Sequence, residues 1–178
     1  MKAHIFAEDS NTSAEDRTKP AKEYFQGLFG TVAGLTDELS ESADTSLHVL
    51  SEDFGVLRGD QPITEATEFQ QKTSADLWKS AQEELLTAAR EADVMVILLS
   101  TDAFEKTVGE IWPEIIEEAK SDSIWCIGAA RSTLDSVELE KLEKKGCSII
   151  AYRRVGVARI GTDARDELLQ AVTQNHTE

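Results

Sequence analysis

The chain has 178 residues, which favours one domain, and 40% of them are hydrophobic, which is enough for a sizeable core. Its 34 acidic residues outnumber the 18 basic ones and give a formal net charge of −16. A negative charge of that size argues against a generic nucleic-acid-coating or membrane-surface protein.

Hydrophobic periodicity predicts an alternation of strands and helices along the chain. We expect strands at 2–7, 46–51, 93–100, 123–128 and 147–152. Helices are expected at about 20–39, 65–91, 101–119 with a break at Pro113, 134–145, and from 162 onward. The interpretation is one domain over residues 1–172, followed by a frayed tail at 173–178.

This alternation predicts an α/β fold: a single open, mostly parallel five-stranded sheet with helices on both faces. Ligands of such sheets bind outside the carboxyl ends of the strands. The segments that follow the strands therefore supply the candidate ligand-binding residues, which are Ser10, Asn11, Ser51, Arg58, Arg131, Ser132, Arg153, Arg154 and Arg159.

Positive charge is concentrated in one of these regions. Residues 146–165 hold four of the eight arginines against a single aspartate, a net of +3, so the rest of the chain carries −19 (−16 minus 3). Arginine suits bidentate recognition of phosphate or carboxylate. Three interpretations remain open: a phosphate or nucleic-acid contact, pairing with surface carboxylates, or a subunit interface.

Motifs for other chemistry are missing. The sequence has no P-loop, no GxSxG elbow and no HExxH, and we expect neither a metal nor a cofactor. His4 and His48 fall inside predicted strands, which favours histidines with satisfied hydrogen bonds in the sheet. Cys126 and Cys147 are interpreted as buried free thiols. With no signal peptide and an apolar run of only six residues at 94–99, the expectation is a soluble cytoplasmic protein without a membrane partner.

The acidic residues are scattered along the chain and form no tail. Scatter predicts a solvated acidic surface, and this surface resembles those of proteins from salt-loving archaea. An acidic surface meant for a basic partner would instead be clustered.

The segment LHVLSEDFGVLRGDQPI, residues 47–63, resembles the YaaA peroxide-stress family and its smaller relatives of unknown function. The matching positions are Leu50, Ser51, Phe54, Gly55, Val56, Leu57, Arg58 and Ile63, with Tyr24, Gly27 and Phe29 upstream. The match covers about a quarter of the chain, Lys22 to Ile63. It implies an α/β fold and, as in the larger members, binding to duplex DNA in stress protection. The chain lacks the Cys or Ser with lysines that small members carry after the first strand.

Three hypotheses for function follow. The first, which we prefer, is a domain that binds a phosphate-bearing ligand, nucleic acid or nucleotide. The second is an enzyme acting on a nucleoside or glycosidic bond, with acid–base chemistry from Glu8, Asp9, Glu52 and Asp53. The third is an oligomeric interaction domain without catalysis, in which the clustered arginines face a second copy of the chain.

Overall fold

A computed structural model describes residues 1–8, 15–16, 18–25, 29–51, 55–62, 74–129, 134, 137–153 and 162–177. The strands are β1 (Lys2–Glu8), β2 (Asp44–Ser51), β3 (Gly55–Arg58), β4 (Val94–Leu98), β5 (Ile124–Ala129) and β6 (Ser148–Arg153). The helices are α1 (Ala21–Tyr24), α2 (Phe29–Ser40), α4 (Ser74–Glu91), α5 (Thr101–Phe104), α6 (Trp112–Glu118), α8 (Leu139–Lys144) and α9 (Thr162–Thr177), and a π-helical turn, η1 (Glu105–Gly109), joins α5 to α6.

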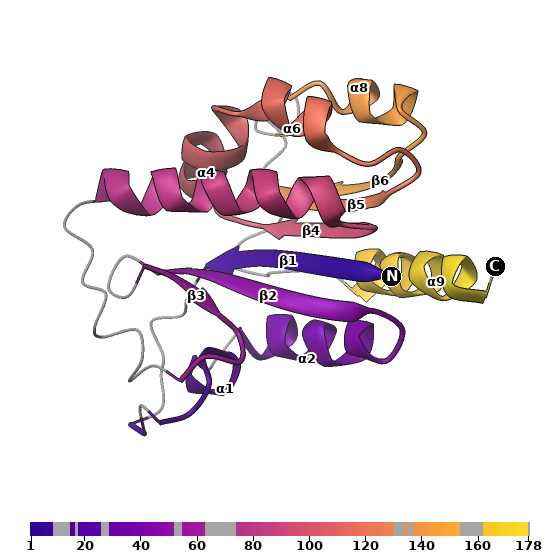
Figure 1. Ribbon diagram of the computed structural model, residues 1–178. Helices are drawn as coiled ribbons and strands as arrows, with labels where there is room; N and C mark the ends of the chain where they lie inside the picture. Colours follow the sequence, from indigo (N-terminus) through magenta and orange to yellow (C-terminus); the bar gives the residue numbers. More distant parts are fainter. Residues whose placement is uncertain are drawn as a thin grey trace.

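All six described strands form one open sheet in the order β3-β2-β1-β4-β5-β6. Five of them are parallel, and β3 alone runs antiparallel to its neighbour β2. Helices α4, α6 and α8 lie over one face of the sheet, and α2 and α9 lie over the other (Figure 1). The predicted fold class, a mostly parallel α/β sheet with helices on both faces, is confirmed.

The number of strands differs from the prediction, because the sheet has six strands and not five. The added strand is β3, which lies outside all of the strands expected from the sequence. Gly55 begins the strand with φ of 84°, a backbone angle that glycine adopts without strain. Gly55 then pairs with Ser51 in the antiparallel register.

Each strand of the sheet centre supplies both cores, because alternate side chains point to opposite faces. In β4, Val94, Val96 and Leu98 pack with α2 and α9, whereas Met95 and Ile97 pack with α4 and α6. All five residues of this strand are buried. The continuously apolar run in the sequence therefore corresponds to a strand that is covered on both faces.

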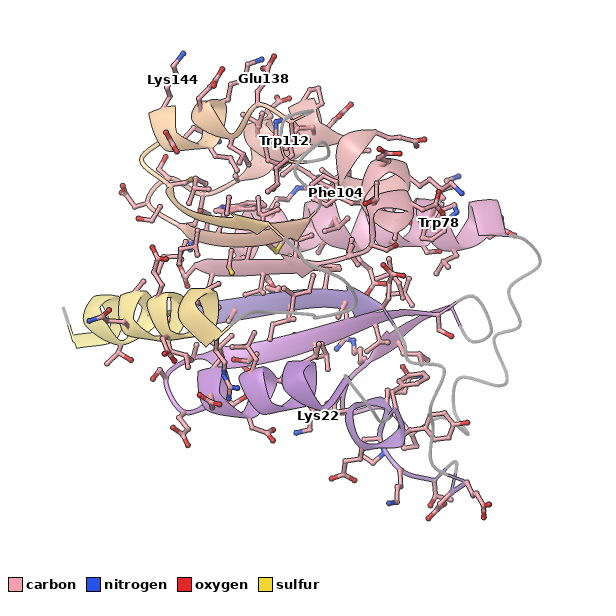
Figure 2. The ribbon with its side chains drawn as sticks, turned by 180° about the vertical axis from the view of Figure 1, so that it is seen from behind. Lys22, Trp78, Phe104, Trp112, Glu138 and Lys144 are labelled. Carbon is pink, nitrogen blue, oxygen red and sulfur yellow. The ribbon has the colours of Figure 1, made fainter. Side chains whose placement is uncertain are left out.

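The helices on the two faces of the sheet form two layers, with the sheet between them (Figure 2). Trp78, Phe104 and Trp112 lie on the side of α4 and α6, and Lys22 lies on the opposite side, where its ammonium contacts Asp37 of α2 at 2.6 Å.

The expected helix at 101–119 is divided as the proline predicts. Ser100 caps α5 by accepting a hydrogen bond from the backbone N–H of Ala103, and α6 begins with Pro113 in its first turn. The expected helix at 20–39 is two helices, α1 and α2, with α2 ending at Ser40. At the C-terminus α9 continues through Thr177, across most of the segment interpreted as a tail.

Candidate functional site

The carboxyl ends of the parallel strands lie along one edge of the sheet. The chain order reverses at β1, which lies between β2 and β4, and this reversal is where doubly wound sheets open a ligand crevice. At this point the carboxylate of Glu8, the last residue of β1, accepts a hydrogen bond from the backbone N–H of Ser100. The backbone N–H of Ser100 is therefore occupied by the Glu8 carboxylate and is not free to bind an anionic ligand.

A second position on the same edge is the corner formed by β5 and β6. These strands are parallel and adjacent, and their last residues, Ala129 and Arg153, are partners in the register. Both chain segments that leave this corner carry arginine in the sequence, Arg131 after β5 and Arg154 after β6. We call the ends of β5 and β6 the basic corner.

The structure describes two of the other predicted ligand residues. Ser51 is buried at the end of β2, opposite Gly55. Arg58 is the last residue of β3. Six residues lie outside the described part of the chain, namely Ser10, Asn11, Arg131, Ser132, Arg154 and Arg159.

Arg58 and Arg153 stand on the two edge strands of the sheet, β3 and β6. Five strand spacings separate these edges, which is about 24 Å at about 4.8 Å per spacing. Arg58 also pairs with His48 in the register, three residues before the carboxyl end of β2. One compact ligand cannot contact both arginines, so the predicted set divides into two regions.

Another arginine of the basic stretch has a structural partner. The Arg165 guanidinium on α9 forms an ion pair with Glu38 on α2. For this arginine, pairing with a surface carboxylate is the observed outcome, and the pair joins the two helices on that face of the sheet.

Arg58 lines a groove of about 400 Å³ beside α4. His4 and His48 line it from β1 and β2, and Glu83, Glu84 and Glu91 line it from α4. Three carboxylates against one guanidinium make this groove unsuitable for a phosphate dianion, because like charges repel strongly where solvent is partly excluded.

The two histidines form a continuous chain of contacts across the groove. His4 Nδ1 lies 3.0 Å from His48 Nε2. The outer ring nitrogens contact carboxylates: His4 Nε2 lies 2.7 Å from Glu91, and His48 Nδ1 lies 3.3 Å from Glu84. The interpretation of these histidines as satisfied within the sheet is confirmed, but the sequence did not indicate that they contact each other.

Burial shapes the electrostatics of this chain. Desolvation, together with the neighbouring His48, lowers the pKa of His4 below the usual histidine value, although Glu91 acts in the opposite direction. The hydrogen bond from His4 lowers the pKa of Glu91. Phe6 stacks on His48 with ring centroids 4.3 Å apart and nearly parallel planes, so an apolar ring covers one face of that imidazole.

The buried cysteines do not extend the site. Both Cys126 and Cys147 are free thiols, as predicted, and burial raises the pKa of Cys126 to about 12. At neutral pH this thiol is not a nucleophile, because the thiolate is the reactive form. Across the described ranges, no three His, Cys, Asp or Glu side chains come together as a metal site. No helix in the described part of the chain is long and apolar enough to span a bilayer.

Comparison with known proteins yields little. Neither a protein-family model nor a curated protein matches the sequence. One similar solved structure is a diflavin flavoprotein A3 from Nostoc sp., which is 12% identical with a TM-score of 0.47, over 99% of this chain and 97% of that one. Function is therefore inferred from this chain's own residues.

Proposed function

We propose that the protein binds a phosphate-bearing ligand, a nucleic acid or a nucleotide, at the basic corner. The observation that carries this proposal is the register of β5 and β6, whose last residues, Ala129 and Arg153, are partners. In the sequence Arg131 follows Ala129 by two residues and Arg154 follows Arg153 directly, so the segments that leave these adjacent strand ends are rich in arginine. Guanidinium groups bind phosphate oxygens bidentately, which suits a phosphate-bearing ligand.

Charge limits the form of this ligand. The net charge of −16 repels a polyanion at most approaches, so binding requires a focused patch and not a broad surface. Salt screens this long-range repulsion over about 10 Å at 0.1 M. We also propose that the protein is cytoplasmic and is adapted to high salt concentration. Its scattered carboxylates would keep it hydrated under those conditions.

The resemblance of residues 22–63 to the YaaA family makes duplex DNA the first probe. Labelled duplex DNA is titrated with the protein by fluorescence anisotropy over a salt series in which the protein stays folded. Saturable binding that weakens as salt rises is expected, because each phosphate contact releases counterions. If duplex DNA does not bind, nucleotides are tested by thermal stabilisation.

The decisive variant is R153A/R154A, and K79A/R90A is its matched control. Both variants remove two positive charges, but Lys79 and Arg90 lie on α4, and Arg90 there pairs with Glu118 at 2.7 Å. We expect R153A/R154A to lose at least about tenfold in affinity and to reduce the salt slope by about two phosphate contacts. Equal affinity in the two variants, or no binding of DNA or nucleotide by the folded wild type, would overturn the proposal.

A further inference from the structure

The hydrogen-bond contacts of His4 and His48 determine how many protons the two imidazole rings carry together. Three contacts join the chain Glu91–His4–His48–Glu84, and each needs one hydrogen between its two heavy atoms. A neutral imidazole carries one N–H and an imidazolium carries two. Two neutral rings supply two hydrogens for three contacts, and two imidazolium rings place two N–H groups face to face between His4 and His48.

We propose that His4 and His48 are a proton-binding site that holds one shared proton and fastens α4 to the sheet. With one neutral ring and one imidazolium, all three contacts contain a single hydrogen. We call this arrangement the histidine clasp. It joins three elements, since His4 lies on β1, His48 on β2, and both glutamates on α4.

The surrounding charges favour the first proton. Glu84 and Glu91 contact the rings directly, and Glu83 lines the same groove from α4. Two cations oppose them: Arg58 on β3 lines the groove, and Lys2 on β1 lies 3.4 Å from the Glu91 carboxylate. Three carboxylates against two cations leave a negative balance, which one proton on the buried pair offsets.

The short distance between the two rings disfavours the binding of a second proton. A further proton would put two N–H donors within 3.0 Å of each other, so the contact between the rings would have to break. Burial, followed by the charge of His48, lowers the pKa of His4, which acts in the same direction. The two steps of the pair are therefore expected to be separated by more than about one pH unit, as in coupled titrations.

The effect on stability follows from proton counts. In the unfolded chain both histidines become charged as pH falls through about 6.5. The folded pair already holds its one proton above that pH, so stability first rises as pH falls through the first step. Below about 6.5 the unfolded chain binds two protons against one in the folded pair, and stability then decreases as pH falls further. On acidification the clasp is released when the second proton finally binds, and the attachment of α4 to β1 and β2 is weakened.

The test is a titration of the histidine rings by NMR between pH 5 and pH 9, comparing the wild type with E84Q and E83Q. H176Q serves to assign the third histidine, which lies near the end of α9. Glu83 and Glu84 are neighbours on α4, and Glu84 contacts His48 at 3.3 Å. The amide of E84Q can donate to His48 Nδ1, so two neutral rings then satisfy every contact.

We expect two separated steps in the wild type and a first step lowered by at least about one pH unit in E84Q. E83Q removes a charge from the groove but no contact to a ring, so we expect a clearly smaller lowering there. Two histidines that titrate together near the ordinary value would overturn the proposal. Equal first steps in E84Q and E83Q would also overturn it. If E84Q does not fold, the separation of the two steps in the wild type alone decides the matter.

Discussion

The Glu8 carboxylate accepts a hydrogen bond from the backbone N–H of Ser100, and this contact joins the end of β1 to the start of α5. Both residues are partly buried, and Ser100 also caps α5 through its side chain. One carboxylate therefore stabilises the sheet edge at the position where the strand order reverses. This is the position that sequence reasoning assigned to acid–base chemistry.

Replacing Glu8 tests the structural role. E8A leaves the Ser100 N–H without its acceptor, and we expect the free energy of unfolding to fall by about 1–3 kcal/mol, the usual cost of leaving a donor unsatisfied away from water. Urea denaturation followed by circular dichroism measures this loss.

E8Q is the matched control, because its amide oxygen can still accept from Ser100. We expect it to lose clearly less stability than E8A. Equal losses in the two variants would show that charge, and not the hydrogen bond, is what Glu8 contributes.

The sheet was predictable from sequence because its signals are local. Period-two alternation and continuously apolar runs identify strands such as β4 without knowledge of their neighbours. The short strand β3 escaped because four residues with a glycine at the start look like a turn. Its partner is β2, only a few residues back, and pairing between the two cannot be read from periodicity.

The groove could not be predicted for a different reason. His4 and His48 are 44 residues apart, and their contact depends on β1 lying next to β2 and on the register of Phe6 with His48. Glu84 and Glu91, which complete the chain, come from α4. Strand order and helix placement are global properties, so no local pattern brings these four residues together.

The side chain of Lys145, which follows α8 in the sequence, caps the C-terminal end of α6. Its ammonium donates hydrogen bonds to the carbonyls of Ile116 at 2.6 Å, Glu117 at 3.2 Å and Ala119 at 2.7 Å. These carbonyls have no partner within the helix, and positive charge is favourable at a helix C-terminus. We expect K145M to lower the free energy of unfolding by about 1–3 kcal/mol in chemical denaturation.

The neighbouring lysine provides the control for that experiment. Lys144 is exposed and points away from the molecule (Figure 2). K144M removes the same charge, yet we expect a change within about 0.5 kcal/mol, as for most surface substitutions. A loss in K144M as large as that in K145M would contradict the assignment of the effect to the α6 carbonyls.

Gly146 lies between α8 and β6, at the helix stop predicted from sequence. Its φ is +90°, and a Cβ added there would lie 2.6 Å from the Asp122 carboxylate oxygen. Asp122 itself has a positive φ of 67°, so this side of the contact is constrained as well. G146A combines a disfavoured backbone angle with a steric clash, and we expect a loss of about 1–3 kcal/mol.

Gly109 is the contrasting position for the same change. It ends η1, and an added Cβ would lie 3.6 Å from the Phe104 carbonyl oxygen, an ordinary contact. Because alanine favours helical backbone over glycine by up to about 1 kcal/mol, G109A should be neutral or stabilising. Thermal denaturation of both variants decides the matter: a lower midpoint for G146A alone agrees with the left-handed turn before β6, and equal midpoints would contradict it.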